Sequence, residues 1–196
     1  MEDGIPMARP MEFDRSEALA RAIDAFWECG YGALSANDLA DRMRIGKSSL
    51  YNTFGSKAEL LQEAVVGYTD LKSAALQQAM RGRSAVDVLR ALLLDIVKRN
   101  DDGRGCLLVN TAVELGRHDA HVAQTTRAGF DAMAAAFEGL IASAQQAGEI
   151  RADLDAKDHA RILVTSIAGL RVMVQSGFTS KEMRPFIETV LASMRI

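Results

Sequence analysis

The chain has 196 residues, 48% of them hydrophobic, and its 23 Lys and Arg against 26 Asp and Glu give a formal net charge of −3. This length and apolar content can bury a sizeable core in one domain or in two small ones. The acidic balance excludes a protein drawn to nucleic acid by its overall charge, so any site for a polyanion must be local.

The cysteine usage and the lack of a recognisable targeting signal lead us to expect a reduced, soluble protein of the cytoplasm. Cys29 and Cys106 form neither a disulfide framework nor a CxxC zinc motif. The start MEDGIPMARP lacks the features of a signal peptide, and no segment approaches the roughly 20 apolar residues that cross a bilayer. His118 and His121 lack a third and fourth ligand, so we expect no metal. We also expect no cofactor and no membrane partner.

Helix signals dominate the chain, because Ala, Leu, Glu, Lys, Arg and Gln fill most segments and there are only three prolines. We therefore predict an all-α fold of about nine helices. In chain order the expected helices span roughly 14–30, 35–43, 47–54, 56–80, 84–99, 105–116, 119–147, 156–176 and 181–194.

Capping patterns set the boundaries in the first part of the chain. Asp14 with Glu17 and Ser56 with Glu59 have the spacing of capping boxes, and Ser35 can cap the short second helix. The resulting division is a small N-terminal unit, residues 1–56, joined through the helix after Ser56 to a larger helical body, residues 57–196.

The stretch RIGKSSLYNTFGSKAELL, residues 44–61, crowds polar side chains between helical segments. Two short helices joined by a tight turn have the order of a helix-turn-helix, whose second helix enters the major groove. A solvated surface helix would explain the polar run alone, but the surrounding positive charge and the capped helix that follows favour a DNA-binding unit. Candidate solvent-side donors and acceptors are Lys47, Ser48, Ser49, Asn52 and Thr53, and the neighbouring cations are Arg42, Arg44 and Lys57.

The segments ALARAIDAFWECGYGALSANDLADRMRIGK and SLYNTFGSKAELL resemble the DNA-binding domain of the TetR family of bacterial transcriptional regulators. This resemblance implies an all-helical homodimer in which helices one to three bind DNA, helix four connects, and a variable helical body binds a small ligand. It places Ser35 near a phosphate, Lys47, Ser48 and Ser49 near base edges, and Tyr51 and Lys57 on the DNA backbone.

Two positions depart from the pattern of the family. Arg44 stands in the turn where many members have Gly, so either the turn is reshaped or Arg44 adds a phosphate contact. The N-terminal arm carries few cations, which leaves Arg9 as its candidate for a minor-groove contact.

Apolar stripes in the body have two interpretations, intrachain core or dimer interface. The resemblance favours an interface, because the last two helices of TetR proteins pair with those of a partner into a four-helix bundle. The candidate interface residues are Leu163, Ile167, Leu170 and Val174 in the penultimate helix and Phe186 and Val190 in the last.

Large apolar side chains at helical spacing could likewise be core or line a ligand cavity, and they do not reveal an inducer. The candidate cavity residues are Phe130, Met133, Phe137 and Met173.

Cys106, in GRGCLLVNTAVELG, is either plain packing or a thiol sensor. We expect it in the first turn of a helix, where the helix dipole and Arg104 would stabilise a thiolate. The stretch also resembles the GCL segment of a TetR subgroup that includes electrophile- and oxidant-sensing repressors.

These patterns favour a ligand-responsive repressor that binds a pseudo-palindromic, double-stranded DNA operator as a homodimer and is released by an unknown small molecule or a thiol-reactive signal. Two other classes remain, a small helical enzyme and a helical interaction protein without DNA specificity. The motifs GxSxG, GxxxxGKS and HExxH are absent from the sequence, so no catalytic residue is assigned and we do not expect an enzyme.

Overall fold

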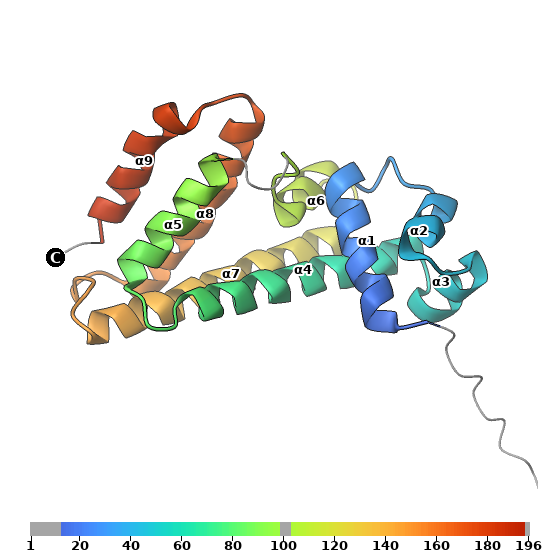
Figure 1. Cartoon of the computed structure of the whole chain (residues 1–196), viewed down its shortest axis with the longest axis horizontal. Helices are drawn as coiled ribbons and strands as arrows, with labels where there is room; N and C mark the ends of the chain where they lie inside the picture. The colour runs from blue at the N-terminus through green and yellow to red at the C-terminus, as the bar shows by residue number, and fades with distance from the viewer. Residues whose placement is uncertain (1–12, 99–102, 195–196) are drawn as a thin grey trace, which may run out of the picture.

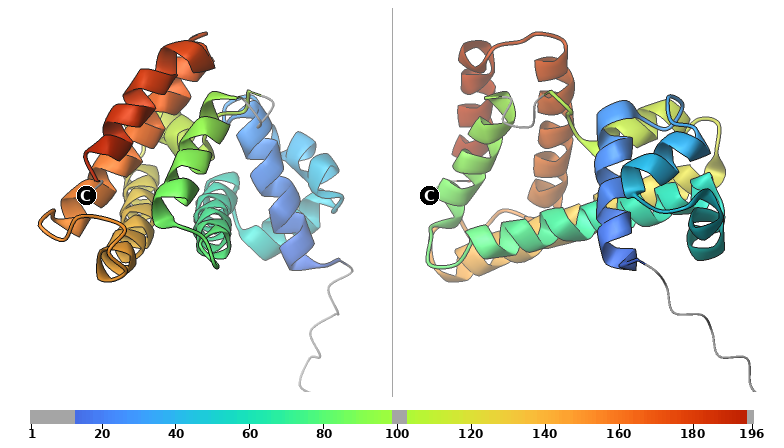
Figure 2. Two further views of the ribbon diagram at one scale, coloured as in Figure 1. Left: turned by 60° about the vertical axis from the view of Figure 1, so that its left-hand side comes forward. Right: turned by 45° about the vertical axis from the view of Figure 1, so that its right-hand side comes forward.

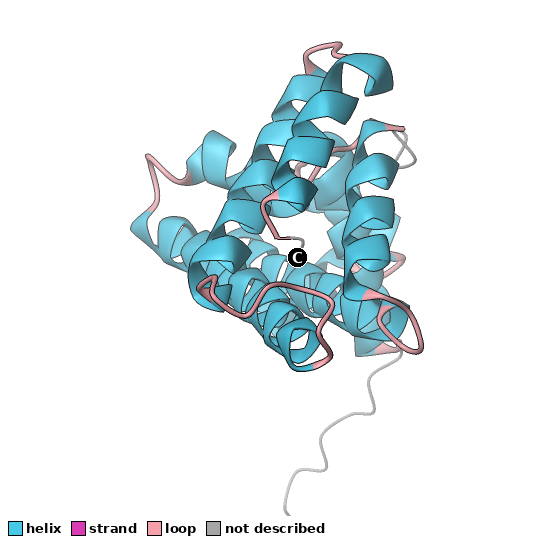
Figure 3. Ribbon diagram, turned by 90° about the vertical axis from the view of Figure 1, so that its left-hand side faces the viewer, coloured by secondary structure: helices cyan, strands magenta, loops and turns pink. Residues whose placement is uncertain are grey.

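The computed structural model describes residues 13–98 and 103–194. Within these residues there are nine α-helices and no strand, which confirms the all-α class (Figures 1 and 3). Arg9 and the end of the helix expected at 84–99 lie outside the described residues. The helices are α1 (Arg15–Cys29), α2 (Ala36–Met43), α3 (Lys47–Phe54), α4 (Lys57–Ala79), α5 (Ala85–Val97), α6 (Leu107–Leu115), α7 (Ala120–Gln146), α8 (Ala156–Gln175) and α9 (Ser180–Ala192).

Side-chain caps begin the helices of the N-terminal unit close to where the sequence predicts them. Ser35 and Ser56 each form a complete capping box, Ser56 with Glu59 as expected. The Asp14 side chain caps α1 by accepting hydrogen bonds from two backbone N–H groups. The reciprocal bond of a capping box, in which the Glu17 carboxylate would accept the Asp14 N–H, does not form. The carboxylate of Glu17 instead pairs with Arg21 one turn further along α1, so the predicted capping box is only half present.

The helix expected at 105–116 begins two residues later than predicted. Gly105 has a φ of +70°, which lies outside the right-handed helical region. As a result α6 begins at Leu107, and Cys106 is its N-cap residue with extended backbone rather than a member of its first turn.

Two long helices, α4 and α7, run side by side along most of the molecule (Figures 1 and 2). The three short helices α1–α3 gather at the end where α4 begins, while α5, α8 and α9 stand at the other end. Between them α6 lies beside α1 and packs on α7. The N-terminal unit and the body are therefore joined by more than one helix.

The buried apolar residues form two clusters that α4 connects. The first cluster combines α1–α3 with the N-terminal half of α4, up to Tyr68, and with the start of α6. The second combines the end of α4, including Leu76, with α5, α8, α9 and the second half of α7. Because the first cluster extends well beyond residue 56, the N-terminal unit shares part of its core with the body.

In the turn between α2 and α3, Arg44 adopts the left-handed backbone conformation that glycine usually adopts. Its φ of 57° and ψ of 43° are those of a helix C-cap, and its N–H bonds back to carbonyls of α2. A left-handed conformation costs a residue with a Cβ roughly 1–2 kcal/mol. The turn is thus not reshaped to suit Arg44.

Replacing Arg44 by Gly is expected to raise the free energy of unfolding by about 0.5–1 kcal/mol, because Gly adopts this conformation without the Cβ clash. The matched control is Arg42→Gly inside α2, which should lower that free energy by about 1 kcal/mol. Urea unfolding followed by circular dichroism measures both variants. Equal losses of stability in the two variants would contradict a strained turn.

Candidate nucleic-acid interface and ligand cavity

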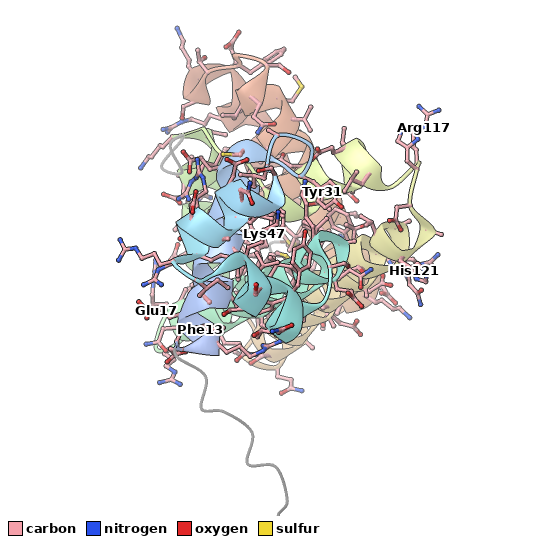
Figure 4. All side chains as sticks on the ribbon, turned by 90° about the vertical axis from the view of Figure 1, so that its right-hand side faces the viewer. Phe13, Glu17, Tyr31, Lys47, Arg117 and His121 are labelled. Atoms are coloured by element: carbon pink, nitrogen blue, oxygen red, sulfur yellow. The ribbon has the colours of Figure 1, made fainter. Side chains whose placement is uncertain are left out.

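The α2–α3 pair presents one apolar and one polar face. Leu50 and Phe54 of α3 are buried in the first cluster together with Met43 of α2. The polar side chains between them point outward, and Figure 4 shows Lys47 at the end of the molecule formed by α1–α3. Lys47, Ser48, Tyr51 and Asn52 are exposed, as are Ser35 and Arg44, while Ser49 and Lys57 are partly buried.

Two of the four cations near α3 make contacts within the chain. Arg42 forms an ion pair with Glu28 at 2.7 Å. The ammonium of Lys57 donates to the backbone carbonyl of Tyr31 at 2.6 Å and lies 4.0 Å from the centre of the Tyr31 ring. Burial lowers the pKa of Lys57, which agrees with its inward orientation. Within the described residues Arg44 and Lys47 form no ion pair, so they carry the outward positive charge of this face.

The N-terminus of α3 also favours an anion. Gly46 caps the helix without a side-chain hydrogen bond, and the first turn contains no acidic residue. The first N–H groups of a helix have no partner within it and carry a partial positive charge. With Lys47 as its first residue, α3 therefore offers a phosphate both a charge and backbone donors.

A cavity of about 400 Å³ lies in the body between α4, α5, α7 and α8. One end contains polar groups, with Tyr68 and Lys72 from α4, Asp95 from α5 and Arg171 from α8. Cys106 adjoins this end, and the Tyr68 hydroxyl donates to its sulfur at 3.7 Å. Apolar residues of α4, α5 and α7 line the remainder, namely Leu76, Ala79, Val88, Leu92, Ile96, Met133 and Phe137.

Trp27 of α1 connects the polar end of the cavity to the N-terminal unit. Its indole N–H donates to the carbonyl of Gly105 at 3.1 Å, and its ring meets the Tyr68 ring edge-on with centroids 5.2 Å apart. Arg104 lies 4.1 Å and Lys72 lies 4.8 Å from the Trp27 ring centre. A displacement of the Tyr68 or Lys72 side chain therefore acts directly on Trp27 of α1.

A second connection runs from the C-terminal end of α6. The Glu114 carboxylate accepts the backbone N–H groups of Tyr31 at 3.0 Å and of Gly32 at 2.6 Å. These residues belong to the loop between α1 and α2, whose carbonyl at Tyr31 also accepts from Lys57. Glu114 thus positions the N-terminal unit relative to the body.

Comparison with known proteins identifies the family. The description "Bacterial regulatory proteins, tetR family" matches residues 18–64, and "Tetracyclin repressor-like, C-terminal domain" matches residues 82–189, which is more than half of the chain. The chain belongs to the TetR family. It is a DNA-binding transcriptional regulator, as the sequence predicted.

Individual relatives agree with this assignment. The uncharacterized HTH-type transcriptional regulator YezE of Bacillus subtilis is 32% identical over 80% of this chain and 84% of its own. The HTH-type transcriptional repressor ComR of Escherichia coli is 25% identical over 93% and 90%. The TetR family regulator CifR, solved as a cysteine mutant with a 26-base-pair operator, has a TM-score of 0.78 at 29% identity, covering 95% of this chain and all of that one.

In this TetR-family regulator, the predicted cavity residues divide into two groups. Cys106, Met133 and Phe137 line the cavity. Phe130 instead packs against the first cluster, because it lies about one turn before Met133, where α7 begins to line the cavity. Met173 is partly buried and is not among the described residues that line the cavity, so neither Phe130 nor Met173 lies at this cavity.

Much of the predicted dimer stripe lies inside the chain. Leu163 and Leu170 are 0% and 2% exposed, so they have no surface left for a partner protomer. Val174 and Val190 are also buried in the second cluster, and Ile167 lines the cavity. These five residues form intrachain core or cavity wall, because α5 and α7 pack on α8 and α5 packs on α9. Phe186 remains exposed and stays a candidate.

No sequence pattern pointed to most of the groups at the polar end of the cavity. Tyr68 and Lys72 are one helical turn apart on α4, but Asp95 and Arg171 come from distant helices. Trp27 and Glu114 were likewise missed, because a contact across helices leaves no periodic pattern. In the two described stretches no group of three potential metal ligands occurs, and no described helix is long and apolar enough to cross a membrane.

Proposed function

We propose that this regulator represses transcription as a homodimer on a pseudo-palindromic operator and is released when a small molecule occupies the cavity. The observation that carries the DNA part is the exposed start of α3, which has no side-chain cap and lies beside Arg44 and Lys47. ComR carries the name of a repressor, and CifR was solved on operator DNA, which supports the same role here. Binding rather than catalysis is then the activity, exercised in the cytoplasm, where the bacterial chromosome lies.

The polar residues of this surface receive different roles in the proposal. Lys47, Ser48 and Ser49 begin α3 and reach base edges in the major groove. The remaining residues contact phosphates and set the register on the duplex. These are Ser35, Arg44, Tyr51, Asn52 and Lys57, the last in addition to its contact with Tyr31.

The cavity carries the ligand part of the proposal. Its volume of about 400 Å³ is within the usual range for small-molecule sites, and its lining combines apolar walls with a few polar groups. Tyr68 and Cys106 belong both to this lining and to the first core cluster. A ligand that moves them therefore alters the packing that holds α1–α3.

The dimer part rests on apolar side chains that remain on the surface of α8, α9 and the loop between them. Ile162 and Val172 are each 46% exposed, and Phe186 of α9 is 44% exposed. Phe178, in the connecting loop, is 38% exposed. Exposed apolar groups gathered on two neighbouring helices are typical of a protein interface.

On DNA from around its own gene, wild-type protein should prefer one pseudo-palindromic duplex over its scrambled sequence. Lys47→Ala and Ser49→Ala should change base preference, whereas Tyr51→Phe should weaken binding to all sequences alike, each by roughly 1–3 kcal/mol. Gel-shift titrations against both duplexes measure this, with Lys157→Ala on the distant helix α8 as the control. Equal affinity of wild type for the two duplexes would contradict the proposal.

Phe186→Glu combined with Ile162→Glu should yield monomers, because two charges would lose their hydration in the proposed interface. Operator affinity should fall with the dimer, because two half-sites are no longer linked. Light scattering measures the mass, and Val113→Glu on α6, where Val113 is 76% exposed, is the control. A double variant that remains dimeric would exclude this face.

A second release mechanism, reaction at Cys106, is favoured by the place of that sulfur in the cavity wall. Alkylation by N-ethylmaleimide would put bulk between Tyr68 and α6, so operator binding should be lost in wild type and in Cys29→Ser but retained in Cys106→Ser. Gel shifts with mass spectrometry of the adduct test this. Unchanged binding after confirmed modification of Cys106 would leave it as a packing residue.

A further inference from the structure

The two ends of the cavity differ in chemistry, and α4 spans both. From Tyr68 to Ala79 the helix contributes to the wall over a length of about 16 Å, at 1.5 Å per residue. The side chains change along this length from Tyr68 and Lys72 to Leu76 and Ala79. A molecule that fills the cavity lengthwise must therefore have one polar and one apolar end.

Among the described residues, positive charge predominates at the polar end of the cavity. Lys72 from α4 and Arg171 from α8 line the same space, and the carboxylate there is Asp95 from α5, which is largely exposed. The ammonium of Lys72 lies 4.8 Å and 5.2 Å from the ring centres of Trp27 and Tyr68. Among the described residues no carboxylate forms an ion pair with Lys72. Besides the more distant Asp95, its charge is met by ring faces, which stabilise a buried cation less than a directly paired anion does.

The protein pays an electrostatic cost for this arrangement. Burial lowers the pKa of Lys72, and the neighbouring Arg171 lowers it further by charge repulsion. Burial also lowers the pKa of Arg171, against the opposing effect of Asp95. Both side chains are thus held where their charged forms are less stable than in water. An anion placed beside them would reduce that cost.

The apolar end of the cavity suits a hydrocarbon. Phe137 of α7 is fully buried and forms its wall with Leu76, Leu92 and Met133. Among the described residues that line this end there is no carboxylate, and the charged residue there, Arg83, is exposed in the loop after α4. Met133 adds a flexible side chain that adapts to differently shaped ligands.

We propose that the ligand of this cavity is an amphiphilic anion, a carboxylate with an unbranched or compact hydrocarbon body. The carboxylate lies between Lys72 and Arg171, and the hydrocarbon extends along α4 toward Leu76 and Phe137. A neutral ligand of the same shape brings no charge to offset the repulsion between Lys72 and Arg171, and a cationic one adds a further positive charge. The inference rests on the proposed function in one respect, that the cavity is where the regulator binds its ligand.

The test uses three probes of one shape and different charge, decanoate, 1-decanol and decylammonium, titrated by calorimetry into the purified full-length protein. Decanoate should bind at least about tenfold more tightly than decanol, and decylammonium most weakly, because a charged hydrogen bond is stronger than a neutral one. Lys72→Met should reduce decanoate affinity about tenfold or more and leave decanol affinity unchanged. Lys157→Met, an exposed position on α8, is the matched control and should bind all three probes like wild type.

Arg171→Gln supplies an independent variant, and thermal melting of each variant establishes that it is folded. Decanol binding as tight as decanoate binding, absence of decanoate binding, or full decanoate affinity in both folded cavity variants would each overturn the inference. These titrations contain no DNA, so they are separate from the proposed function. Operator binding without any probe tests that function, and a decanoate-induced fall in operator affinity that disappears in Lys72→Met would join the two.

Discussion

One helix, α4, belongs to both cores, and the rest of the molecule is arranged around it. The Ser56–Glu59 capping box fixes its start directly after α3, the helix that we propose enters the DNA groove. Its N-terminal half closes the core of α1–α3, and its C-terminal half forms one wall of the cavity. Because close-packed interiors resist gradual deformation, a shift at the cavity end of a continuous helix is passed to the helices packed on its other end.

The contacts of α6 make this dependence more specific. Before its first turn, Gly105 accepts from Trp27 and Cys106 accepts from Tyr68, while near its last turn Glu114 holds the loop between α1 and α2. Trp27 also has Lys72 and Arg104 against its ring. An anion that draws Lys72 toward the cavity would weaken the cation–π contact with Trp27. The group that we propose recognises the ligand is thus also a group that supports α1.

Local features of this fold could be predicted from the sequence, and features that depend on neighbouring helices could not. The caps at Ser35 and Ser56 and the helix-turn-helix residues follow from short-range chemistry. Helical periodicity shows that Leu163 and Leu170 share an apolar face, but not whether this chain or a partner covers it. For the same reason, the charge count near α3 could not show that Lys57 turns inward to Tyr31. Helical periodicity likewise could not show that Lys72 and Arg171 line the same cavity.

The small number of outward cations explains why the proposed dimer matters for an acidic chain. Only Arg44 and Lys47 carry unpaired positive charge on the described α2–α3 face, because Arg42 and Lys57 contact Glu28 and Tyr31. The electrostatic part of DNA affinity grows with the number of phosphates neutralised, so one unit alone gains little from it. Two linked units double those contacts, provided that both α3 helices match their half-sites at once. A modest displacement of α1–α3 against α4 breaks that match, so a ligand need not unfold or block the DNA-reading surface to release it.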